Sequence, residues 1–235
     1  MKRTDLLELF GEVTQTNPLY LQNVGRRNQP VGSLNADRLK SGGRICVHCN
    51  TTRTKPHDKE WTKLSRELRR RLPEMQPGQT FRGSRVFPYD TRRQMVGAHL
   101  YFVKIFGCHV AELGIPLDLA SFGAAIMNDR PHPKVHLKFG FGALTYGEPH
   151  TGHSDIFLKQ TPDGEVKFAW WHHGLGGLSI KVMFAEGEKR HDQLVDAWHP
   201  NLGTSNLKIA DFRSLSNEVE STTPMRGIVE ADEAS

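Results

Sequence analysis

The sequence predicts an α+β fold, because two helix patterns precede a series of strand patterns. Residues 95–106 are apolar on nearly every side, which is typical of a helix buried in a core. Apolar and polar residues alternate in residues 135–139 and 178–184, as in strands with one buried face. We therefore expect a small basic N-terminal module, followed by a larger, mainly antiparallel sheet domain packed on a buried central helix.

The N-terminal part fits one short helix, over residues 4–13, and one longer amphipathic helix. Residues 14–44 indicate loop with a short hairpin. The longer helix begins near Pro56 and Asp58 and stops before Pro73. Its apolar residues, spaced three and four apart, form one stripe of Trp61, Leu64, Leu68 and Leu72. The opposite face carries Lys59, Lys63, Arg66 and Arg70.

The second half continues with the buried helix and the strands. Asp90 or Thr91 can cap that helix, and Gly114 is a plausible stop beyond Leu113. A turn at residues 161–164 joins a strand at 156–159 to one that starts at Val166 and runs through Trp171.

A connector over residues 76–91, which contains Pro, Gly and Arg, divides the chain into two units. The basic module occupies residues 1–75, and the sheet domain occupies residues 92–213. Residues 214–235 lose hydrophobicity and end in an acidic run, which favours a disordered tail.

Composition indicates a cytoplasmic protein. Three cysteines are too few for a disulfide scaffold, so a reducing compartment is expected. No apolar run approaches the roughly 18 residues of a membrane span, and the N-terminus lacks the apolar core of a signal peptide.

Charge is distributed unevenly along the chain. Residues 1–93 hold 19 Lys and Arg against 9 Asp and Glu, whereas the remainder holds 12 against 17. A basic front part favours DNA or RNA as partner, although a basic surface also serves solubility alone. The acidic second half could instead dock a basic protein partner. The residues expected to contact phosphate are Arg53, Lys55, Lys59, Lys63, Arg66 and Arg70.

Cys46 and Cys49, three residues apart, can hold one metal ion from a tight turn. A structural zinc needs four ligands, and His57 could supply a third. Cys108 lies in the apolar helix and is expected to be an ordinary buried thiol. A redox pair and two free thiols remain alternatives.

The stretch from Gly42 to Arg53 resembles the closing half of an HNH endonuclease, the ββα-metal nuclease family. In that family Cys-x-x-Cys is followed by Asn or His, which Asn50 matches here. Asn35 matches the asparagine that orders the loop, and Cys46 and Cys49 match the second zinc pair. The resemblance covers roughly residues 33–60 and implies a zinc-finger-like module with structural zinc.

The family's catalytic base is a histidine on the first strand, and residues 1–47 contain none. Gln22 and Asn23 stand at the matching place, and an amide has no pKa useful for a base near neutral pH. Three explanations remain open. The HNH-like scaffold has lost its nuclease activity, the chain starts downstream of the first half of the finger, or the match is accidental.

The leading expectation is a nucleic-acid-binding protein on a degenerate HNH-like finger. An active nuclease would use Asn50 and His57 with Mg²⁺ or Mn²⁺ and a base from elsewhere in the fold. A protein-interaction module of a phage or defence system is the third alternative.

Two further groups of residues are notable. His150, His153 and Asp155 form a second candidate cluster for a metal or for acid–base chemistry. Trp170, Trp171, His172 and His173 could stack on bases, although alternating aromatics in a sheet usually form core and cross-strand pairs.

Overall fold

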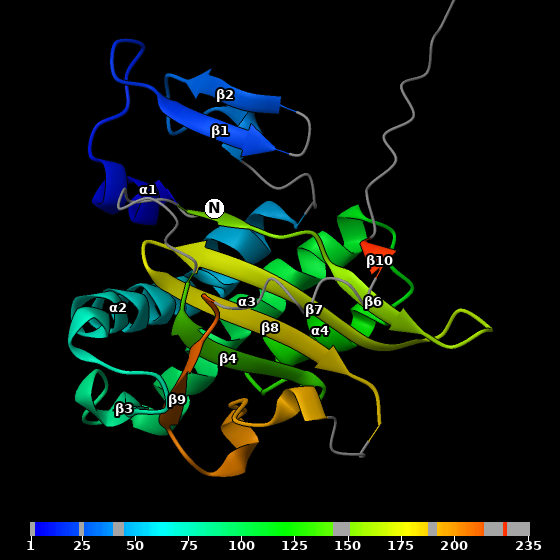
Figure 1. Ribbon diagram of the computed structural model, residues 1–235. Helices are drawn as coiled ribbons and strands as arrows, with labels where there is room; N and C mark the ends of the chain where they lie inside the picture. The colour runs from blue at the N-terminus through cyan, green and yellow to red at the C-terminus, as the bar shows by residue number, and fades with distance from the viewer. Residues whose placement is uncertain are drawn as a thin grey trace, which may run out of the picture.

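The computed structural model describes residues 3–23, 26–39, 45–142, 151–187, 192–213 and 223–224. Helices α2 (Lys55–Arg71), α3 (Thr91–Glu112) and α4 (Leu119–Met127) cover one face of a multistranded sheet (Figure 1). This arrangement confirms the predicted α+β fold. No helix in the described ranges has the length and apolar character needed to cross a membrane.

The sheet is mainly antiparallel, as expected. Its strands lie in the order β10 (Thr223–Pro224), β6 (Phe157–Gln160), β7 (Val166–Leu175), β8 (Leu178–Ala185), β4 (Val135–Phe141), β9 (Asn206–Asp211) and β3 (Thr80–Arg82). Strand β5 (Thr151–His153) pairs with β7 beside this path. Among the described strands, β4 and β9 form the one parallel pair, which brings residues 139–141 against residues 209–211.

The strand patterns read from the sequence match the observed strands. In β4, Val135, Leu137 and Phe139 are buried, while the residues between them are partly exposed. The predicted turn closes through a bond from the Gly164 N–H to the Thr161 carbonyl. Strand β7 runs beyond Trp171, where its predicted strand ended, because β8 pairs with it as far as Leu175.

Helix α3 is the buried central helix that the sequence predicts. Leu100, Phe102, Val103 and Phe106 are fully buried. The helix ends at Glu112, and Gly114 adopts a left-handed backbone with φ of +62°, which glycine reaches without strain.

Helix α2 packs on α3 through its apolar stripe. Trp61 packs against two aromatic rings of α3, 5.4 Å from the centroid of Tyr101 and 4.6 Å from that of Phe102. Phe81 in β3 and Phe87 belong to the same core cluster. The hydrophobic core is therefore continuous from α2 across the expected connector at residues 76–91 to the sheet.

A separate small core lies in the N-terminal part, around Leu6, Val31 and Leu39. It is built from α1 (Arg3–Phe10) and a hairpin of β1 (Leu19–Asn23) and β2 (Arg26–Val31). The helix is shorter than expected from the sequence, and the hairpin lies within the range that was expected to contain one.

Helix α4 was not predicted, and the expected tail at 214–235 is hardly described. Helix α4 is capped by the Asp118 carboxylate, which accepts a bond from the Ala120 N–H at 3.0 Å. Its buried face is narrow, with only Phe122, Ala125 and Ile126, so its pattern is weak. The expected disordered tail at 214–235 lies outside the described residues, apart from the two residues of β10.

The parallel pairing of β4 with β9 requires glycine at position 140. A Cβ atom there would lie 2.4 Å from the carbonyl oxygen of Ala210, which is backbone and cannot rotate away. We expect Gly140→Ala to lower the free energy of unfolding by about 1–3 kcal/mol, measured by urea denaturation.

Gly123→Ala is the matched control. Position 123 lies inside α4, and a Cβ atom there would have no heavy atom within 4 Å, so alanine should add about 1 kcal/mol through helix propensity. Equal effects of the two substitutions would contradict the proposed close approach at Gly140.

Candidate functional site

The two cysteines of the Cys-x-x-Cys motif share one exposed turn. The Cys49 N–H donates to the Cys46 Sγ at 3.2 Å, and the Asn50 N–H donates to the Cys46 carbonyl at 2.9 Å. The thiol of Cys49 lowers the pKa of Cys46, chiefly by a hydrogen bond between the two side chains. Both thiols are free, and Cys46 and Asn50 are exposed. The turn leads through the five-residue helical segment η2 (Cys49–Arg53) into α2.

The described residues supply two of the four ligands that a structural zinc needs. Within those ranges, no three His, Cys, Asp or Glu side chains form a group that could hold a metal ion. The structure therefore does not assemble Cys46, Cys49 and His57 into a three-ligand site. Zinc at the two cysteines, and the zinc-finger-like module it implies, stay predictions.

His57 is turned into the protein rather than toward the turn. Its side chain is 4% exposed, and its Nε2 lies 3.1 Å from the Asp129 carboxylate. Burial lowers the pKa of His57, against the opposing effect of Asp129. The ring is therefore mostly neutral at pH 7, and its position gives a substrate little access.

Arg53 fastens the turn to the end of α4. Its guanidinium donates to the carbonyls of Ile126 and Met127 and to the Asp129 carboxylate at 2.8 Å. These carbonyls belong to the last turn of a helix, where they have no partner within the helix. Arg53 was expected to contact phosphate, but the structure gives its guanidinium an anchoring role.

A second polar contact joins α2 to α3. The Lys104 ammonium donates to the Asp58 carboxylate at 2.6 Å and to the Thr54 hydroxyl at 3.1 Å. Lys104 is nearly buried, and sequence reasoning missed it. A lone lysine in an otherwise apolar helix was the available signal, because a buried ammonium requires a partner.

The predicted cations on the exposed face of α2 form two groups, which differ in whether they pair with a carboxylate. Lys55, Lys59 and Lys63 are exposed and make no ion pair within the described residues. Arg66 is paired with Glu8, 3.2 Å away, and Arg70 with Glu67, 2.7 Å away. The lysines are thus freer than the arginines to meet an anion.

A half-buried carboxyl lies beside these cations. Burial is the main cause that raises the pKa of Glu60 to about 7, while Arg93 and Lys63 act in the opposite direction. The carboxylate rests on the backbone of α3 at Gly97, where a Cβ would collide with its Oε2. Arg93, at the start of α3, therefore lies within electrostatic reach of the same carboxyl as Lys63.

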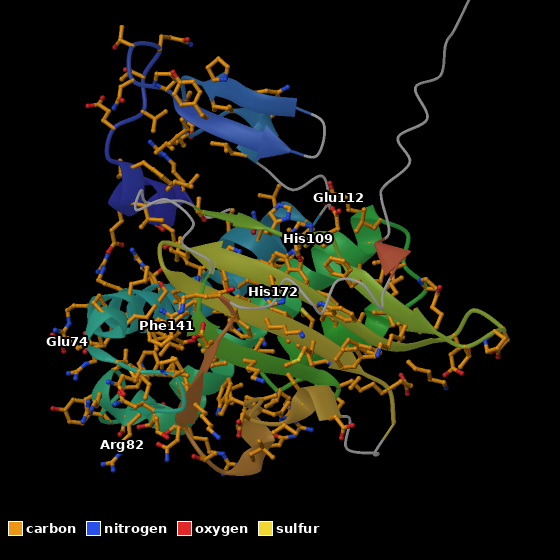
Figure 2. All side chains as sticks on the ribbon, in the orientation of Figure 1. Glu74, Arg82, His109, Glu112, Phe141 and His172 are labelled. Carbon is orange, nitrogen blue, oxygen red and sulfur yellow. The ribbon has the colours of Figure 1, made fainter. Side chains whose placement is uncertain are left out.

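The second candidate cluster is only partly described, because His150 lies outside the described residues. His153 has its ring centroid 5.1 Å from that of His109, and its Nδ1 is 3.2 Å from the Ser154 carbonyl. Asp155 is exposed nearby. Figure 2 shows His109 and Glu112 near the end of α3. These residues are not among any group that could hold a metal within the described ranges.

The aromatic run of β7 is core rather than a stacking surface. Trp170 and Trp171 are 3% and 1% exposed, so neither offers a face to a base. Trp171 packs on His109 of α3 and His173 on Phe102 of α3, whereas Trp170 belongs to a separate cluster with Phe168 and Met183. Core and cross-strand packing is therefore the observed role.

Cys108 is partly buried, and burial raises the pKa of its thiol, as in an ordinary core thiol.

Comparison of the chain with protein-family models, with curated proteins and with solved structures gives no match. The resemblance to the HNH endonucleases therefore remains a prediction from residues of the Cys46–Asn50 turn and its surroundings.

The contact between Lys104 and Asp58 gives a prediction about stability. Lys104→Met removes the ammonium partner of a partly buried carboxylate, and we expect a loss of about 2 kcal/mol in the free energy of unfolding. In a double-mutant cycle with Asp58→Asn, the two losses should not add. Additive losses would show that the pair is not coupled.

Buried histidines give a prediction about pH. Burial lowers the pKa of His99 and of His173 to about 3 and that of His132 to about 4, from 6.5 in the unfolded chain. The unfolded chain binds more protons between these values, so stability is fully present above pH 6.5 and is lost as pH falls below it. We expect the Tm to decrease steadily from pH 7 to pH 5.

The matched variant is His99→Gln, whose amide can still bond to the Val135 carbonyl that His99 contacts at 2.9 Å. An amide does not titrate, so this variant should be less stable at pH 7 but show a weaker dependence of Tm on pH. An unchanged dependence would exclude His99 as a contributor.

Proposed function

We propose that the chain binds nucleic acid, with the exposed face of α2 contacting the phosphate backbone. The observation that carries the proposal is the stripe of Lys55, Lys59 and Lys63, which are exposed and unpaired within the described residues. Successive lysines are four residues and about 6 Å apart along the helix axis, so they can meet different phosphates of one backbone.

The position of α2 supports this use of its surface. Its apolar stripe is fully buried against α3, which fixes the orientation of the helix and turns the lysines outward. Arg53 and the pair of Lys104 with Asp58 hold the start of the helix in place. A charged face on a rigid element loses little conformational entropy when it binds.

Cations from a second element extend the surface. Arg92 and Arg93 are exposed at the start of α3, where Arg93 lies 3.7 Å from the Asp90 carboxylate and also acts on the Glu60 carboxyl. Arg66, Arg70 and Arg93 add weaker contributions, because each already pairs with a carboxylate. The revised interface therefore centres on three lysines, with Arg92 beside them.

The nuclease alternative receives less support from the geometry. Asn50 is exposed on the cysteine turn, whereas His57 is buried and engaged with Asp129. The two residues are thus not presented together to a substrate.

The proposal predicts a loss of affinity on removal of two lysines. Lys59→Ala with Lys63→Ala should weaken binding to duplex DNA or RNA about ten-fold or more, measured by fluorescence anisotropy at low salt. The slope of log Kd against log salt should fall by about 0.9 for each lysine that contacts B-DNA.

The control removes two lysines from the β6–β7 hairpin, at the other end of the sheet from α2 (Figure 1). Lys159→Ala with Lys167→Ala changes the net charge equally and should retain most of the affinity. If both variants lose affinity equally, the loss follows from the change in net charge and not from the face of α2. If the unmodified protein binds no nucleic acid, the proposal is wrong.

A further inference from the structure

A hollow of about 340 Å³ lies between the C-terminal end of α2 and strand β3. Figure 2 shows Glu74 and Arg82 at this side of the molecule. The hollow is within the size range of pockets that hold small ligands. Its lining includes two cations, Arg71 and Arg85, from elements that are separate in the sequence.

The two guanidinium groups differ in how they are held. Arg71 donates through its Nε to the Glu67 carboxylate, and within the described residues its two terminal nitrogens have no hydrogen bond. Glu67 also pairs with Arg70, so one carboxylate is shared between two cations. Arg85, in the short helical segment η4 (Gly83–Arg85), is exposed and forms no ion pair within those residues. The pocket thus has an excess of positive charge.

The rim of the pocket is fixed by backbone bonds. The Gly78 N–H donates to the Ile209 carbonyl at 2.7 Å, and the Ile209 N–H donates to the Gln79 carbonyl at 2.8 Å. The side-chain carbonyl of Gln79 accepts the Gln76 N–H at 3.1 Å, which leaves its amide N–H groups as donors. Guanidinium and amide donors on a fixed rim are suited to an anion.

The rest of the lining indicates what the anion is attached to. Met75 is the partly exposed apolar residue of the lining, because Phe81 is only 2% exposed, and Glu74 adds one carboxylate beside the two arginines. A phosphate with a small apolar part beside it satisfies these features. Arg71 lies eight residues beyond Lys63 on the same helix, about 12 Å along its axis.

We propose that this pocket binds the terminal phosphate of a nucleic-acid strand, with the last nucleotide held between Arg71 and Arg85. The inference rests on the proposed function, because the strand would reach the pocket along the lysine face of α2. Planar guanidinium groups bind phosphate through paired hydrogen bonds, which favours a terminal monophosphate with its free oxygens over an internal diester.

The test compares short single-stranded oligonucleotides with and without a terminal phosphate, at the 5′ or the 3′ end, by fluorescence anisotropy. We expect the unmodified protein to bind a phosphorylated end about ten-fold more tightly. Arg85→Gln should reduce that preference to less than about two-fold. Arg82→Gln is the matched control, because Arg82 is an exposed arginine three residues away that does not line the pocket.

The outcomes separate this inference from the proposed function. If oligonucleotides bind but neither terminal phosphate matters, the pocket assignment is wrong and the lysine face stands. If a nucleoside monophosphate binds in a manner that depends on Arg85 while no oligonucleotide binds, the pocket stands as a nucleotide site and nucleic-acid binding is wrong. A phosphate preference that survives Arg85→Gln overturns the pocket, provided that the variant keeps the Tm of the unmodified protein.

Discussion

The packing of Trp61 against Tyr101 and Phe102 is the interaction on which the rest of the structure depends. It joins α2 to α3 in one core, and large buried aromatics contribute more to such a contact than any other side chains. Because this contact fixes the rotation of α2, it decides which side chains reach the surface. The cationic face, the Glu60 carboxyl at Gly97 and the pair of Lys104 with Asp58 all follow from that rotation.

Much of the fold can be read from the sequence, because the deciding patterns are local. The stripe that includes Trp61 and Leu64, the apolar run of α3 and the alternation in β4 each report one element and its buried face. The alternation in β8 reports the strand alone, because all of its residues are buried. The pairing of β3 with β9 and of β9 with β4 is different. It joins segments far apart in the chain, and short strands such as Thr80–Arg82 carry no periodicity strong enough to predict it.

In the candidate site, too, the sequence predicts what depends on local spacing but not what depends on tertiary contacts. Residue type and helical spacing place Lys59 and Lys63 on an exposed face, since helix geometry alone determines which residues share a side. Which cations are already engaged depends on tertiary partners. Asp129 holds Arg53 and Glu8 meets Arg66, and neither carboxylate is close to its partner in the sequence. The role of Arg85 was likewise invisible, because its pocket forms only where η4 meets the end of α2.

Strand β9 has a consequence for how the molecule is assembled. It inserts between β3 and β4, and it bonds through Ile209 to the backbone at Gly78 and Gln79. During synthesis, α2 and α3 leave the ribosome long before residues 206–211 do, so a nascent chain can pack its helices while this edge is still unpaired. Contacts between such distant segments form late and slow the folding of a domain. Because Ile209 bonds to the backbone of Gly78 and Gln79, the rim beside Arg71 has its final shape only when β9 is in place.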